Sequence, residues 1–167
     1  LRCPVCGKHP CICIKEVDCE NLAPLAGDNS VATSSLYNEV TELAQFSEFL
    51  NAVAGSSVEH GTTGYHDADG ALQLMMPYTD GQTNSVQVAW NPDASNVVFI
   101  HNHPRNTACS STDVVKLIEF REKYDSSLRS VYVVTAINIY VLYVYDETRA
   151  HNFYNSGAFL GFMRLYQ

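Results

Sequence analysis

The chain has no long apolar run and little positive charge. None of its hydrophobic stretches approaches the roughly 20 residues needed to cross a membrane, and no signal-peptide pattern stands at the N-terminus. These absences predict no membrane partner and favour a cytoplasmic location, with a secreted effector or toxin domain as the alternative. Ten Lys and Arg residues stand against 18 Asp and Glu residues, for a net charge of −8 and a pI near 5.1. That balance argues against a nucleic-acid backbone as the main partner.

Cysteine is scarce beyond the first nineteen residues. Of the six cysteines, only Cys109 lies outside that stretch. Cys3 and Cys6 stand in a Cys-Pro-Val-Cys-Gly sequence, which is typical of a zinc knuckle because the tight turn lets two thiolates converge on one ion. Candidates for a second pair are Cys11, Cys13, Cys19 and His9. We expect one structural zinc ion held by Cys3, Cys6, Cys11 and Cys13. A disulfide cluster in an exported protein and half of a zinc ribbon stay open as other interpretations.

The length and hydrophobic content set the domain organisation. A chain of 167 residues with 46% hydrophobic residues suits one well-buried domain and a small appendage. We assign residues 1–30 to the Cys-rich module and a linker, and residues 31–167 to the folded domain. The residue patterns predict a helix over 35–54, strands over 58–65, 71–78, 85–90 and 97–103, a helix from 111, strands over 130–135 and 139–145, and a helix from 157 onward. This order predicts an α+β fold, a layered β-sheet flanked by helices.

The most informative stretch begins with a buried strand, Val-Val-Phe-Ile, that leads into two histidines. Side chains alternate across a strand, so His101 and His103 are expected on the same face. Pro104 cannot donate to a sheet ladder and therefore ends the strand. A short loop then leads to Ser110 and Asp113 at the start of a helix, where the carboxylate of Asp113 can face the end of the strand.

Two imidazoles and one carboxylate make three metal ligands. A catalytic zinc site has this number, because its fourth position holds water, whereas a structural zinc site is closed by four protein ligands. Two simpler interpretations compete with a metal site. A His-x-His pair by itself is usually a pair of solvent-exposed polar side chains, and the spacing of Ser110 and Asp113 is also that of a helix capping box. A cap and a metal ligand are compatible, so we expect His101, His103 and Asp113 to hold one catalytic zinc ion.

These residues resemble the signature of the JAMM metalloproteases, also called MPN+ or JAB proteins. That signature has an upstream Glu, then His-x-His-Pro, then Ser-x-x-Asp, and the matching residues here are His101, His103, Pro104, Ser110 and Asp113. The Asn between the histidines is most similar to the RadC-type bacterial branch. One departure is the loop of six residues between His103 and Ser110, one shorter than is usual in the family.

The resemblance implies an MPN/JAB-like fold over about residues 35–167, of the cytidine-deaminase-like layered kind. It also implies zinc-dependent hydrolysis of a peptide or isopeptide bond, next to a ubiquitin-like protein in many members. Glu59 is the glutamate that would serve as the general base, since it follows the first helix and begins the first predicted strand. Ser110 would help to stabilise the oxyanion. The other upstream glutamates fall on the predicted helix and are better explained as its solvated face: Glu39, Glu42 and Glu48.

Two other functions remain open for this sequence. The family includes inactive members, so the chain could keep the fold as a scaffold or binding module without turnover. The likeness to the RadC-type branch and the Cys-rich module also allow a nucleic-acid-associated protein, although the acidic composition weighs against it. A protein or peptide substrate is the expected partner.

Overall fold

A computed structural model of the chain describes residues 35–87 and 89–165. The predicted Cys-rich module, with Cys3, Cys6, Cys11 and Cys13, lies outside the described residues. The elements in chain order are helices α2 (Ser35–Glu42) and α3 (Ala44–Val53), strands β1 (Gly61–His66), β2 (Leu72–Leu74) and β3 (Ser95–Asn102), helix α4 (Ser111–Lys123), strands β4 (Ser130–Val134) and β5 (Ile139–Tyr143), and helices α5 (Glu147–Tyr154) and α6 (Gly157–Leu165). The described residues include no helix that is both long and apolar enough to cross a bilayer.

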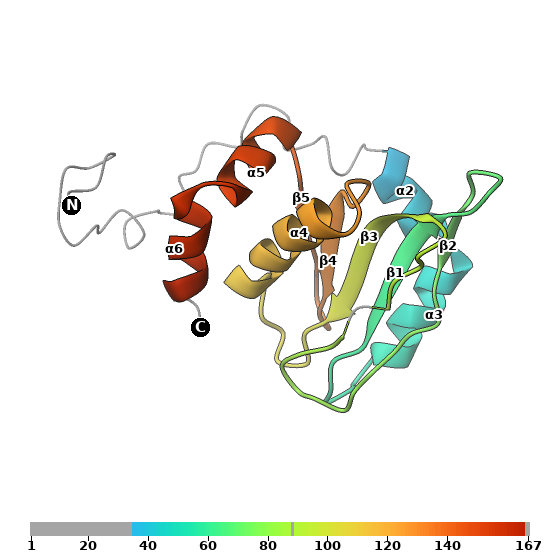
Figure 1. Ribbon diagram of the computed structural model, residues 1–167. Helices are drawn as coiled ribbons and strands as arrows, with labels where there is room; N and C mark the ends of the chain where they lie inside the picture. Colours follow the sequence, from blue (N-terminus) through green and yellow to red (C-terminus); the bar gives the residue numbers. More distant parts are fainter. Residues whose placement is uncertain (1–34, 88, 166–167) are drawn as a thin grey trace. The chain divides into compact units, whose positions relative to one another are not determined.

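The five strands form one mixed sheet in the order β2-β1-β3-β4-β5. Strands β3 and β4 are parallel, and the other neighbouring pairs are antiparallel. A parallel pair needs a crossover connection, and α4 supplies it. The α+β class with a helix-flanked sheet is therefore confirmed. Figure 1 shows α4 in front of the central strands, with α2 and α3 at the other side of the sheet.

Alternating side chains on β3 divide the core into two layers. Val98 and Ile100 are fully buried and belong to the cluster on the side of α2 and α3. Phe99 faces the other way and packs with Leu117 of α4. Because His101 is two residues beyond Phe99, alternation directs its ring to the same side as α4. The Phe99 and His101 rings are stacked, with their centroids 5.2 Å apart.

The first predicted helix is two helices. Leu43 has an extended backbone (φ −67°, ψ 133°) and separates α2 from α3. Its carbonyl accepts hydrogen bonds from the N–H groups of Phe46 and Ser47, so the second helix starts at once. The break lets Val40 of α2 and Phe49 of α3 reach one core cluster.

The predicted strand over 85–90 is wrong for the described residues of that stretch, none of which belongs to a strand. Its apolar residues Val86 and Trp90 pack over the face of the sheet, on the cluster that contains Phe99. The Thr63 hydroxyl holds the segment by donating a hydrogen bond to the Ala89 carbonyl. Burial of a segment over a sheet face produces the same apolar pattern as a paired strand.

Several boundaries also differ from the prediction. The first hairpin is formed, but β2 has only three residues, and Tyr78 joins Gly61 through an isolated bridge. Helix α5 was not predicted. It has no buried residue, and Asp146 caps it by accepting a hydrogen bond from the N–H of Arg149.

Candidate metal centre

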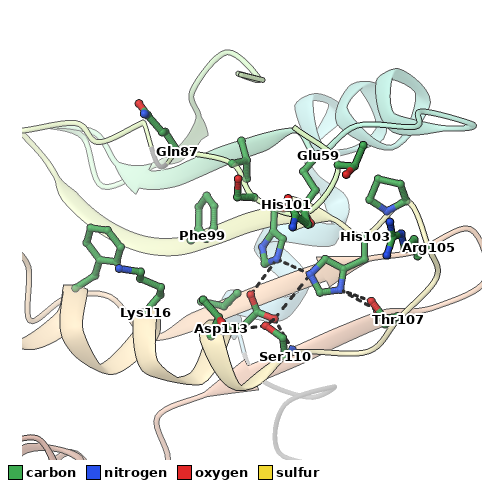
Figure 2. A pocket seen from close by; sticks show the side chains of 18 residues that line it. Glu59, Gln87, Phe99, His101, His103, Arg105, Thr107, Ser110, Asp113 and Lys116 are labelled. Atoms are coloured by element: carbon green, nitrogen blue, oxygen red, sulfur yellow. Dashed lines mark hydrogen bonds and ion pairs between the residues drawn. The ribbon is translucent and has the colours of Figure 1, made fainter. Parts of the chain in front are cut away.

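The candidate metal centre lies where β3 ends and α4 begins. His101 is on β3, His103 stands one residue after the strand, and Asp113 is the third residue of α4. The crossover from β3 to β4 brings the helix N-terminus back beside the strand end, and the three side chains face one another (Figure 2). All three residues are buried, with exposed fractions of 3%, 9% and 9%. The spacing in the sequence had predicted this grouping.

The ligand atoms of these residues converge on one point. The Nε2 atoms of His101 and His103 are 3.1 Å apart, and Oδ1 of Asp113 is 3.1 Å from Nε2 of His101. Oδ2 of Asp113 is 3.8 Å from Nε2 of His103. One ligand atom from each residue lies within 4.8 Å of the other two, close enough for all three to hold one metal ion. Among the described residues no other group of His, Cys, Asp and Glu meets this criterion.

Hydrogen bonding orients the ring of His103 for a ligand role. Its Nδ1 lies 2.9 Å from the carbonyl oxygen of Thr107, which can only accept. We therefore assign the hydrogen to Nδ1, which leaves the lone pair of Nε2 directed at His101 and Asp113. Nδ1 of His101 is buried and has no hydrogen-bond partner among the described residues. Lone pairs and a carboxylate gathered so closely repel one another unless a cation or a proton lies between them, so the donor set fits a metal ion.

Asp113 also belongs to the predicted capping box, which is confirmed. Its N–H donates to Oγ of Ser110 (3.2 Å), and its Oδ2 accepts from the Ser110 hydroxyl (2.8 Å) and from the Ser110 N–H. Oδ2 thus serves the cap while Oδ1 faces His101. Burial by itself would raise the pKa of the Asp113 carboxyl, but the hydrogen bonds from His101 and Ser110 bring that pKa below its usual range. The carboxylate form that a metal ligand requires is favoured.

Glu59 lies in the same cavity as the three ligands, although it is not on a strand as predicted. It stands two residues before β1 and is 6% exposed. Its N–H donates to the carbonyl of Gln82 (2.7 Å), and its carbonyl accepts from the Thr79 hydroxyl (2.6 Å). Burial raises the pKa of the Glu59 carboxyl, and the neighbouring His101 and His103 offset part of that rise. A raised pKa suits a group that takes up and releases a proton.

Sequence reasoning missed the role of Asn102, which is 4% exposed. Its Oδ1 accepts from the His60 N–H at 2.6 Å, and its Nδ2 donates to the Val58 carbonyl at 3.2 Å. The amide therefore joins the residues on both sides of Glu59 to the end of β3. Alternation indicates that the residue between two ligand histidines points to the other side, but nothing local in the sequence names its partners, which lie 42 and 44 positions away.

The cavity at this site measures about 680 Å³. Apolar side chains form one part of its lining: Val86, Phe99, Phe120 and Val131. Ser110 lines it as well, as does the Thr83–Gln87 segment. Two cationic residues also line the cavity, Arg105 and Lys116. In Figure 2 they lie on opposite sides of the histidines.

The remaining candidates from the sequence lie elsewhere. Glu39, Glu42 and Glu48 are exposed on α2 and α3, in agreement with the interpretation as a solvated helix face. His66 forms an ion pair with Glu39, and His60 contacts Ser56. None of these residues lines the cavity.

No protein-family model, no curated protein and no solved structure matches this chain. The function is therefore inferred from the residues of the cavity and their chemistry.

Proposed function

We propose that this chain is a zinc-dependent metallopeptidase of the JAMM (MPN+) type, built on an MPN-like fold. The observation that carries the proposal is a single cavity that holds three buried ligand residues and a separate buried carboxylate, Glu59. The ligands and the base come from segments far apart in the sequence. A helix cap would explain Asp113, and solvent exposure would explain a lone histidine. Neither explains why these buried side chains and Glu59 line one cavity.

The donor set favours zinc. Two imidazole nitrogens and one carboxylate oxygen are ligands that Zn²⁺ binds well, and three protein ligands leave a coordination position open. When bound, zinc supplies Lewis acidity: it lowers the pKa of a coordinated water towards ~7 and polarises a carbonyl group. A closed structural site would need a fourth protein ligand, and the described residues offer none in this cluster.

Residues of the chain transfer the proton, orient a ligand and stabilise the oxyanion. Glu59 takes the proton from the attacking water and delivers it to the leaving amine, a transfer for which its buried, raised-pKa carboxyl is suited. The Thr107 carbonyl keeps the His103 ring in its ligand orientation. Ser110 stabilises the capped helix, and its oxyanion role requires its hydroxyl to rotate away from the Asp113 oxygen that it now contacts. The cavity accepts a peptide or isopeptide substrate, with a ubiquitin-like protein as the partner that the family resemblance implies.

Glu59→Gln tests this function most directly. The amide keeps the size of the side chain but cannot accept the proton, so turnover should fall by ~10²–10⁴-fold while zinc stays bound. Elemental analysis would measure the zinc content, and a peptide panel would measure hydrolysis. Glu48→Gln, an identical change on the exposed face of α3, is the matched control and should alter neither quantity.

Each failure has its own meaning. Loss of zinc from the Glu59 variant would make this residue a ligand, and full activity would place the base elsewhere. If the wild-type chain binds zinc but hydrolyses nothing across a broad panel that includes ubiquitin-like conjugates, the scaffold function replaces the peptidase.

A further inference from the structure

Two cationic side chains stand on opposite sides of the candidate metal centre. Arg105 follows the His-Asn-His-Pro sequence directly, and Lys116 lies about one helical turn after Asp113 on α4. Both line the cavity, and Figure 2 shows them flanking the histidines and Asp113. A chain laid across the metal centre would therefore meet a positive charge on each side of the reacting bond.

These cations contrast with the charge of the whole chain, which is −8. Among the residues that the structure describes, two carboxylates line the cavity, Glu59 and Asp113, and both have other partners or roles. Asp113 contacts His101 and the Ser110 cap. Glu59 is buried beside the histidines. The cavity charges that are still available to a ligand are therefore positive, although the whole chain has a net charge of −8.

Lys116 is held in place but not neutralised. Its Nζ lies 5.7 Å from the centre of the Phe120 ring and 3.2 Å from a carboxylate oxygen of Glu119. The other oxygen of Glu119 accepts from Lys123 at 2.6 Å. One carboxylate therefore serves two ammonium groups, and the trio keeps a net positive charge. An additional carboxylate beside Lys116 would complete the balance.

Arg105 is exposed and forms no hydrogen bond or ion pair with another residue in the part of the chain that the structure describes. Its guanidinium keeps all five donors for a ligand and matches the geometry of a carboxylate. Apolar side chains also line the cavity, among them Phe99 and Val131. An apolar wall lowers the local dielectric constant and strengthens a charge pair at its edge.

We propose that this cavity selects an acidic peptide segment, in which carboxylates on the two sides of the scissile bond contact Lys116 and Arg105. The position of the scissile bond rests on the proposed peptidase function. The recognition of carboxylates rests on the two cations and the cavity that they line. Segments with basic residues at these places are disfavoured, because they would set like charges against each other.

The first test is binding, measured by fluorescence anisotropy on the full zinc-loaded chain. The probes are three labelled peptides of one sequence that carry Glu, Gln or Lys on both sides of the central bond. The Glu peptide should bind more tightly than the Gln peptide by about 1.4- to 5-fold for each ion pair, the range measured for exposed pairs. The preference should vanish near 1 M salt, where the Debye length is about 3 Å. Equal affinities for the three peptides at low salt would overturn the proposal.

Variants that remove one positive charge then show which cation contacts the carboxylate on each side of the scissile bond. Lys116→Gln should abolish the preference for Glu on one side of the bond, and Arg105→Gln the preference on the other side. Arg149→Gln is the matched control, because Arg149 is an exposed cation on α5 that pairs with Asp146 and does not line the cavity. It should leave the preference intact. Equal losses in the Lys116 and Arg149 variants would show an effect of overall charge and overturn the proposal.

Two further arms separate the outcomes. Peptides with a free or an amidated C-terminus distinguish a terminal carboxylate from a side-chain carboxylate as the recognised group. Tight, charge-dependent binding without hydrolysis would reject the peptidase function and retain the acidic recognition. Hydrolysis of all three peptides at one rate and affinity would retain the peptidase and reject the acidic recognition.

Discussion

Asn102 offers a sharp test of how the fold positions Glu59. Its amide bonds to the His60 N–H and the Val58 carbonyl, which are the residues on either side of Glu59. Asn102→Ala removes both hydrogen bonds and leaves the ligand residues His101 and His103 unchanged. Glu59 should then lose its fixed distance to the metal centre, whereas the metal should remain.

The magnitude follows from the two lost bonds. The Val58 carbonyl keeps a second donor, the hydroxyl of Ser56, whereas the His60 N–H loses the short bond to Asn102. One orphaned donor and one lost bond cost about 2–4 kcal/mol of unfolding free energy, since an orphaned group costs about 1–3 kcal/mol and a bond about 1. The melting temperature should fall by roughly 5 to 15 °C. A displacement of the base by about 1 Å costs on the order of 10²-fold in rate, so kcat should fall by roughly 10- to 100-fold with little change in KM.

Asn96→Ala is the matched control, on the same strand at its other end. Asn96 is fully buried, and its side chain bonds to the N–H and carbonyl of Asn91 and to Asp125. Its loss should lower the melting temperature at least as much and leave kcat unchanged. Calorimetry, steady-state kinetics on a cleaved peptide and elemental analysis would measure the three quantities. An unchanged kcat in the Asn102 variant, or an equal fall in both variants, would refute the positioning argument.

Two further predictions concern the cap and the sheet. Ser110→Ala should lower the free energy of unfolding by about 0.5–2 kcal/mol, and by the same amount with zinc or with a chelator present. The zinc content should stay full, because Oδ1 of Asp113 still faces His101. Loss of zinc from this variant would contradict the prediction. Gly64→Ala should cost about 1–3 kcal/mol in a denaturant titration, because its Cβ would lie 2.5 Å from Cγ1 of Val98. Gly161→Ala, with open space around it, should be neutral or stabilising, and equal effects at the two glycines would refute the packing argument.

Much of the site was predictable because its parts are local. The alternation of β3 placed His101 and His103 on one face, and the spacing of Ser110 and Asp113 predicted the capping box. The length of a short loop limits how far Asp113 can lie from the strand end. These properties depend on residues close together in the sequence, so they can be predicted from the sequence alone.

The errors arose where burial and pairing come from distant parts of the chain. Val86 and Trp90 carry the apolar pattern of a strand, yet they cover the sheet face near Phe99 without pairing. Helix α5 has no buried residue, and ion pairs join its Glu147 to Arg121 and Arg129, which lie far from it in the sequence. Leu43 interrupts a regular helical pattern because both halves must reach the same core.

By itself, the sequence determined which residues could hold a metal and that they lie around the end of one strand and the start of the next helix. Only the tertiary structure decided that Glu59 belongs to the same cavity. The antiparallel pairing of β1 with β3 sets Gly61 opposite His101, so Glu59, two residues earlier, lies near the end of β3 that carries the histidines. Register depends on the packing of side chains across a whole sheet, and a shift of one residue would turn every side chain of the strand to the other face. The same folding decided which Lys and Arg residues of the described part of the chain line the cavity, because the crossover helix brings Lys116 opposite the loop of Arg105.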